Sequence, residues 1–140
     1  MHEFFADANV FLRYLTGDVP EQAAAVERLL RRAEKGNVVL HTNVLVMAEI
    51  VWTLGSFYKL SRPEIRDKVL AMLNTAGLSV ENSGLVAPVV SLFADRNVDF
   101  VDAYNALRMP AHGLEQMVTF DTRHGSRLPR IAALTPDKAR

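Results

Sequence analysis

The sequence predicts an α/β protein with three layers (α/β/α), in which helices cover both faces of a central, mainly parallel sheet of four to five strands. Short apolar runs alternate along the chain with longer segments of helical periodicity, and strands separated by helices are typical of parallel crossovers. No repeat, low-complexity segment or linker interrupts the 140 residues. We therefore expect a single domain over residues 1–140, and a hydrophobic content of 49% suffices for one core.

Five short segments are predicted as strands because each is a brief apolar run bounded by polar or turn-forming residues. The first is "HEFFAD" and the weakest is "IAAL" near the end of the chain. In chain order they are residues 2–7, 37–41, 78–80, 116–120 and 131–134. Ligands of open parallel sheets bind outside the carboxyl ends of the strands, so the residues that follow these runs are candidate site residues.

Six segments are predicted as helices: residues 9–15, 20–36, 42–58, 61–77, 83–97 and a last one from about residue 99. The second has an amphipathic i, i+3, i+4, i+7 pattern, formed by Val26, Leu29, Leu30 and Ala33. Ser61 and Glu64 have the spacing of a capping box at the start of the fourth. The third is apolar nearly all round, so we expect it to be buried.

Composition excludes several classes of site and protein. The chain has no cysteine, which excludes disulfides, thiolate metal sites and a cysteine nucleophile, and fits a reducing compartment. The first residues do not resemble a secretory signal, and no uncharged run approaches the ~18 residues that span a bilayer. We therefore expect a cytoplasmic protein with no membrane partner. The formal net charge is zero, so total charge does not indicate a partner.

Four acids lie where an α/β fold places its site, or on helices that look too apolar for surface. Asp7 follows the first predicted strand, Glu49 lies midway along the third helix, Asp102 lies in the first turn of the last helix, and Asp121 ends the fourth strand. Carboxylates gathered in one cleft repel one another unless a divalent cation binds them. An all-oxygen ligand set favours Mg²⁺, with Mn²⁺ as a substitute, and such an ion activates water for phosphodiester hydrolysis.

Each acid also has a purely structural interpretation. For Asp7 and for Asp121, a role as a helix N-cap or loop acid explains the residue as well as a site does. Asp102 at the third helical position suits the helix dipole. Asp99 is best explained as the N-cap of the last helix. Glu49 is harder to explain, because glutamate is seldom buried without a partner.

Polar neighbours of these acids complete the candidate site. Asn9 and Thr119 are candidates for orienting the carboxylates from a second shell, with capping or surface positions as the alternative. Arg13, Arg108 and Arg123 are candidates for phosphate contacts. For each arginine, a surface or salt-bridge role is the competing interpretation.

Four segments in this order resemble the PIN-domain family, and most specifically its VapC-type ribonuclease toxins of toxin–antitoxin pairs: "FADANVFLRYL", "TNVLVMAEIVWTL", "DFVDAYNA" and "VTFDTRH". The resemblance implies a PIN-like fold and a magnesium-dependent endoribonuclease with an acidic quartet. The matching positions are Asp7, Glu49, Asp102 and Asp121, with Asp99 at the position of a frequent extra acid. It also implies a homodimer, a cognate antitoxin, and structured RNA such as tRNA or rRNA as substrate.

Two other functions compete with the nuclease. One is a non-catalytic interaction module that keeps the PIN fold. The other is a phosphotransfer domain in which Asp7 is the nucleophile, but such sites usually need a lysine, and no lysine follows the carboxyl end of a predicted strand. A phosphoryl adduct on Asp7 would support this second alternative.

Overall fold

The computed structural model describes residues 1–139, the side chain of His124 excepted. The chain divides into two compact units, the first from Met1 to Ala87 and the second from Pro88 onward. The boundary lies within helix α5 (Ser83–Asp95) and coincides with the proline inside that helix.

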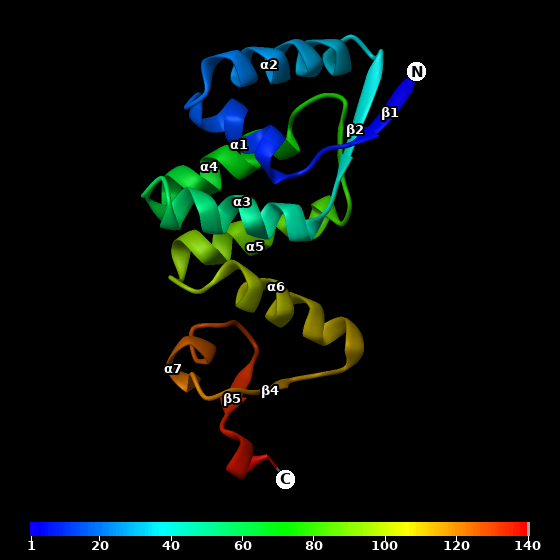
Figure 1. The fold of residues 1–140 in the computed structure, drawn as a ribbon. Coiled ribbons are helices and arrows are strands. Elements are labelled where there is room, and N and C mark those ends of the chain that lie inside the picture. Colours follow the sequence, from blue (N-terminus) through cyan, green and yellow to red (C-terminus); the bar gives the residue numbers. More distant parts are fainter. Residues whose placement is uncertain (140) are drawn as a thin grey trace. The chain divides into compact units, whose positions relative to one another are not determined.

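The first unit contains a three-stranded parallel sheet with β2 in the middle (Figure 1). Its strands are β1 (His2–Phe5), β2 (Val38–Thr42) and β3 (Leu78–Val80). Helices α1 (Ala8–Thr16) and α2 (Pro20–Glu34) connect β1 to β2, and α3 (Val44–Ser56) and α4 (Arg62–Leu73) connect β2 to β3. The predicted parallel crossovers are confirmed. The carboxyl ends of β1 and β2 therefore lie at the same edge of this sheet.

Local sequence signals set the helix ends in this unit as predicted. Gly17 ends α1 in the left-handed conformation at φ 65°. At the start of α4, the Ser61 hydroxyl accepts from the backbone N–H of Glu64, and the Glu64 carboxylate accepts from the backbone N–H of Ser61. This reciprocal pair is the predicted capping box.

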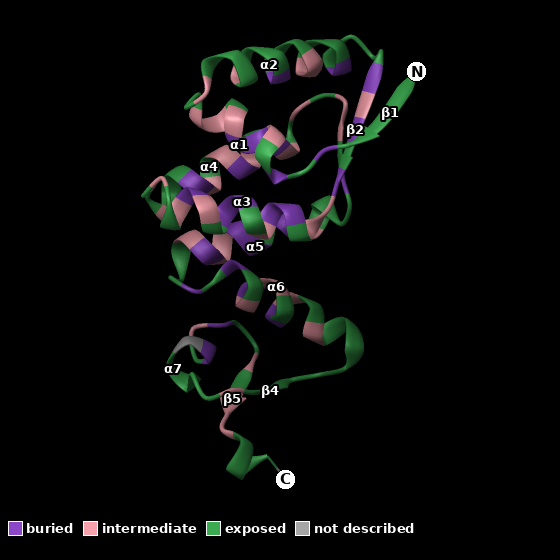
Figure 2. Ribbon diagram, viewed as in Figure 1, coloured by how far each residue is buried: buried purple, intermediate pink, exposed green. Residues whose placement is uncertain are grey.

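Part of the core of the first unit forms where the apolar side of α2 packs against β2, and Figure 2 colours the buried residues of both purple. Val26 and Ala33 form the buried stripe of α2, and Ala33 packs with Val38 and Leu40 of β2. Gly77, before β3, has φ +79°, and a Cβ there would lie 2.5 Å from the Ala33 Cβ. Only glycine fits this close approach between α2 and the start of β3.

Helix α3 differs from its prediction, because it is not buried all round. Its buried face consists of Val46, Met47, Ile50, Val51 and Leu54. The opposite face is exposed and carries Leu45, Glu49, Trp52 and Ser56. These four positions recur at helical spacing, so one side of an almost wholly apolar sequence faces solvent.

The second unit contains α6 (Phe100–Arg108), the 3₁₀ turn Met109–His112, β4 (Gln116–Val118), α7 (Thr122–Gly125), β5 (Ala132–Leu134) and the 3₁₀ turn Pro136–Lys138. Strands β4 and β5 pair in parallel as a two-stranded sheet. All five predicted strands thus form, and all their pairings are parallel. They are hydrogen-bonded into a three-stranded and a two-stranded sheet.

Across residues 1–139, no helix has both the length and the apolar character required to cross a membrane.

Candidate functional site

Asp7 lies just past the carboxyl end of β1 and is the N-cap of α1. Its Oδ1 accepts a hydrogen bond from the backbone N–H of Val10 at 3.3 Å, and its side chain is exposed. The preceding residue, Ala6, is buried and donates its N–H to the His41 carbonyl, which extends the pairing of β1 with β2 to this point. The carboxylate is thus fixed at the sheet edge by both the strand before it and the helix after it.

Glu49 lies on the exposed face of α3, and this corrects the expectation that it sits among buried side chains. Its neighbours Met47, Ile50 and Val51 are buried, whereas Glu49 itself is exposed. Within residues 1–139 its carboxylate has no hydrogen-bond or ion-pair partner. No buried counter-ion is therefore needed.

Thr42 is buried at the carboxyl end of β2, directly before α3. Its Oγ1 has no hydrogen-bond partner in the described part of the chain. The next residue, Asn43, caps α3 through its side chain, which accepts from the Val46 N–H at 3.0 Å. A buried hydroxyl without a partner is unusual, and this one lies on β2, which pairs with the strand that precedes Asp7.

Asp99 and Asp102 flank the start of α6 in the second unit. Asp99 holds the N-cap position, as predicted, but its side chain makes no capping hydrogen bond. The expectation that Asp99 stabilises the helix as a side-chain cap is therefore wrong. Asp102 lies in the first turn of α6 and is half-buried.

Asp121 lies three residues after β4 ends, at the start of α7. Its backbone N–H donates to the Thr119 hydroxyl at 3.0 Å, and its carbonyl accepts from the Gly125 N–H. Thr119 thus fixes the turn that carries Asp121 through a backbone contact, and its role in orienting the carboxylate stays a prediction. Asn9 is the second residue of α1 and is exposed. Asp7, and not Asn9, is the residue that caps α1.

Arg13 is held by protein partners. Its Nε donates to Gln22 at 2.8 Å, and its Nη1 lies 3.2 Å from Asp18 Oδ2. Hydrogen bonds from the Tyr58 and Thr16 side chains, followed by the charge of Arg13, hold the pKa of Asp18 below its ordinary value despite an opposing desolvation. These contacts favour the salt-bridge interpretation of Arg13 over a phosphate contact. Arg108 and Arg123 are both exposed.

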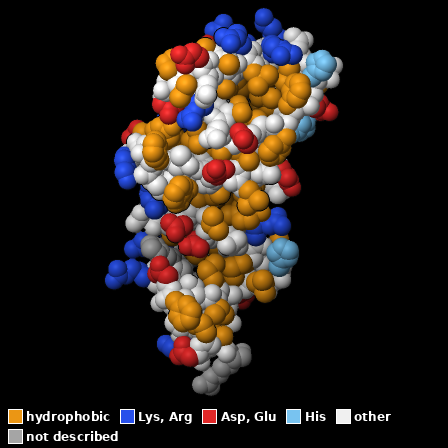
Figure 3. All heavy atoms as spheres, in the orientation of Figure 1, with side chains coloured by type: hydrophobic (Ala, Val, Ile, Leu, Met, Phe, Trp, Pro, Cys, Tyr) orange, Lys and Arg blue, Asp and Glu red, His pale blue; other side chains and the backbone are white. Residues whose placement is uncertain are grey.

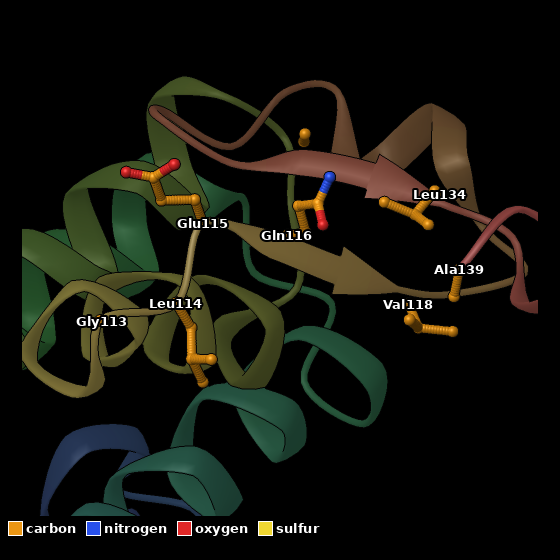
Figure 4. A pocket seen from close by; sticks show the side chains of 8 residues that line it. Gly113, Leu114, Glu115, Gln116, Val118, Leu134 and Ala139 are labelled. Atoms are coloured by element: carbon orange, nitrogen blue, oxygen red, sulfur yellow. The ribbon is translucent and has the colours of Figure 1, made fainter.

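Two hollows in the described surface lie away from these acids. One, of about 520 Å³, lies in the second unit over β4 and β5 and is lined by Leu114, Val118 and Leu134 among others (Figure 4). The other, of about 430 Å³, lies in the first unit between α2 and the end of α4. Neither is lined by any of the four predicted acids.

The predicted quartet draws two acids from each unit: Asp7 and Glu49 from the first, and Asp102 and Asp121 from the second. In residues 1–139, no three or more histidine, aspartate or glutamate side chains are gathered as a metal-binding group. That these four acids act together therefore stays a prediction.

Comparison with known proteins gives one family match and one similar protein. The profile of the PIN domain family matches residues 4–133. The chain is also 25% identical over 117 residues to a protein named VapC ribonuclease from Aquifex aeolicus (strain VF5). That similarity covers 84% of this chain and 86% of the relative.

Proposed function

The chain belongs to the PIN domain family, and on this basis we propose that it is a Mg²⁺-dependent endoribonuclease that acts as the toxin of a toxin–antitoxin pair. The α/β/α fold class predicted from the sequence follows from this membership. The observation that carries the proposed activity is the similarity, over 84% of the chain, to a protein named as a ribonuclease.

The proposed metal ligands are Asp7, Glu49, Asp102 and Asp121, with Mg²⁺ as the ion and Mn²⁺ as a substitute. Carboxylate oxygens are the donors that these hard cations prefer. In the first unit, the exposed Glu49 carboxylate has no partner in residues 1–139, and Asp7 lies exposed at the sheet edge. The buried Thr42 hydroxyl at the same edge provides one further unused oxygen. This donor set fits a divalent cation.

The residues of the chain have separate tasks in this proposal. The Val10 N–H fixes one oxygen of Asp7, and the Thr119 hydroxyl fixes the turn before Asp121, so both acids are oriented before an ion binds. A bound divalent cation supplies an activated water and stabilises the leaving oxygen of the phosphodiester. Exposed Arg108 and Arg123 are proposed to bind RNA phosphates.

Partners are proposed from the family resemblance. The substrate is structured RNA, such as tRNA or rRNA, and the active form is a homodimer. A cognate antitoxin blocks the enzyme by covering the acidic site. An exposed carboxylate such as that of Glu49 would attract a cationic side chain of such a partner.

The test is cleavage of total cellular RNA by the purified, antitoxin-free chain, with Mg²⁺ and with a chelator. Asp7→Asn is the informative variant, because asparagine caps a helix as well as aspartate does but is a poorer metal ligand. The proposal expects discrete RNA fragments that require both the metal and Asp7. If well-folded wild type yields no fragments with Mg²⁺ or Mn²⁺, the non-catalytic interaction module becomes the better function.

A further inference from the structure

Basic residues form one row along the outward side of α2. They recur at i, i+3, i+4 and i+7, which places them on a single side of a helix. This row, the α2 cationic stripe, consists of Arg28, Arg31, Arg32 and the C-cap Lys35. All four are exposed, on the side of the helix opposite to the buried Val26 and Ala33. Figure 3 shows Lys and Arg side chains gathered along α2, at the top of the view.

Most of this positive charge is not neutralised within the described part of the chain. Arg31 has an ion-pair partner, Glu27, at 2.7 Å. The side chains of the other three stripe residues have no hydrogen-bond or ion-pair partner in residues 1–139. Glu27 and Glu34 lie to one side of the stripe, and between Ala24 and Lys35 the outward side of α2 carries no acid. The charges of this helix are thus separated by face.

The stability of α2 does not explain this separation. Two pairs of like charges stand four residues apart in the stripe, which is unfavourable in a helix. The helix dipole favours cations in the last turn only, whereas Arg28 lies more than a turn before the end of α2 at Glu34. Cations clustered along one helix face, beyond what the helix needs, are typical of a surface that binds a polyanion.

The residues around these cations indicate which polyanion fits. A helix that binds a membrane surface inserts large apolar side chains beside its cations, but the exposed residues before Arg28 on this side are Ala24 and Ala25. The core of a stable protein interface is depleted of charge. An RNA backbone presents phosphates at short, regular intervals, and arginine and lysine bind them without any apolar contact. The stripe therefore fits a nucleic-acid backbone best.

The stripe ends at the sheet edge opposite to Asp7. Lys35 directly precedes the turn into β2, which starts at Val38, whereas Asp7 follows the carboxyl end of β1. Because β1 and β2 are parallel, the two edges are separated by the length of a strand, roughly 17 Å for the five residues of β2. A ligand of the stripe is therefore not a ligand of the acidic edge unless it is large.

We infer that the α2 cationic stripe binds the phosphate backbone of the RNA substrate, remote from the acids at the sheet edge. This inference rests on the proposed nuclease function and deepens it by assigning a second RNA contact. An RNA of a few nucleotides at Asp7 does not reach the stripe, whereas a large folded RNA does. The stripe raises the affinity for large RNA of any sequence, since phosphates carry no base identity.

The test measures the binding of total tRNA at several salt concentrations, using the full chain with Asp7→Asn to prevent cleavage. The stripe variant adds three substitutions that keep helix propensity: Arg28→Gln, Arg32→Gln and Lys35→Gln. At about 0.1 M salt, we expect its affinity for tRNA to fall by about 10- to 100-fold. The slope of log affinity against log salt concentration should become less steep by about 2–3, because three phosphate contacts are lost.

A matched control removes the same charge from scattered exposed positions: Lys59→Gln, Arg96→Gln and Lys138→Gln. Its total charge equals that of the stripe variant, so a difference between the two reports on the position of the charges. A tetranucleotide RNA is the second control, and its affinity should be equal in the parent chain and the stripe variant. Circular dichroism checks that each variant is folded.

Three results would overturn the inference: no tRNA binding by the parent chain, equal affinity and salt slope in the stripe and control variants, or an equal loss of affinity for tRNA and tetranucleotide. If the stripe variant loses only the binding of polyglutamate and keeps that of tRNA, the stripe is a contact for an acidic protein. Failure here is distinguishable from failure of the nuclease. RNA cleavage with a KM that the stripe substitutions do not change keeps the activity and removes the inference. Stripe-dependent tRNA binding without any cleavage by the wild type removes the activity.

Discussion

The Tyr58 hydroxyl donates a hydrogen bond of 2.5 Å to Oδ2 of Asp18, across 40 residues of sequence. Tyr58 follows the end of α3, and Asp18 lies between α1 and α2. Arg13 completes the contact, with its Nη1 at 3.2 Å from Asp18 and 3.4 Å from the Tyr58 hydroxyl. This cluster ties the α1–α2 turn to the end of α3, the helix that carries Glu49.

Tyr58→Phe is expected to lower the melting temperature in a pH-dependent way. The hydrogen bond from Tyr58 is the largest cause of the lowered pKa of Asp18. A carboxyl group with a lowered pKa in the folded state stabilises the fold above its ordinary pKa, and this contribution is lost as pH falls through the folded-state pKa. The difference in melting temperature between wild type and Tyr58→Phe should therefore be present at about pH 7 and shrink below about pH 4.

Thermal melts by circular dichroism check this, with Tyr14→Phe as the control. Tyr14 is an exposed tyrosine of α1 without a hydrogen-bond partner in residues 1–139, so its substitution should leave the melting temperature unchanged. A Tyr58→Phe effect of equal size at both pH values would contradict the role given to the Asp18 carboxylate.

Asp7 caps α1 and is also a proposed metal ligand, and two substitutions distinguish these two roles. Asp7→Ala removes the cap from Val10 and the proposed metal ligand, and should cost about 0.5–2 kcal/mol of stability along with the activity. Asp7→Asn keeps a good cap, so its stability should match wild type, while RNA cleavage falls by more than about 100-fold. Denaturant unfolding and RNA cleavage measure the two effects. Cleavage by Asp7→Asn at the wild-type rate would remove Asp7 from the site.

Glu49→Gln is expected to abolish cleavage without a change in stability. The carboxylate is exposed and has no partner in the described residues, so the free energy of unfolding should change by less than about 0.5 kcal/mol. Glu34→Gln, at an exposed position near the end of α2, is the matched control and should cleave RNA normally. Isothermal titration with Mn²⁺ supplies a second readout, in which Glu49→Gln binds the ion more weakly and Glu34→Gln does not.

Asp99 and Asp102 lie three residues apart but should respond differently to substitution. Because the Asp99 side chain makes no capping bond, Asp99→Asn should change stability by less than about 0.5 kcal/mol and leave activity intact. Asp102→Asn should remove cleavage, since Asp102 is a proposed ligand. Parallel unfolding and cleavage assays on the two variants test this. Equal activity in Asp102→Asn and wild type would exclude Asp102 from the metal site.

The positions of the candidate acids in the fold could be predicted from sequence where they follow strands, and less well where they lie on helices. Asp7 is fixed at a sheet edge by the residues next to it, so its position was predictable. For Glu49 the run of apolar neighbours suggested burial, but the sequence does not say which side of α3 faces the sheet. For the same reason the sequence does not predict that Trp52 is exposed. Its exposure in the structure distinguishes it from the core residues of α3.

The sequence by itself determined the order of the five strands and of helices α1 to α6, and most of their ends, because those depend on residues close along the chain. The left-handed turn at Gly17 and the capping box of Ser61 and Glu64 are such local features. Only the tertiary structure decided which partners meet across long separations, as Tyr58 meets Asp18 and Gly77 meets Ala33. It also exposed the Glu49 face of α3, because a helix buries whichever side its neighbours cover, and those neighbours are set by the whole fold.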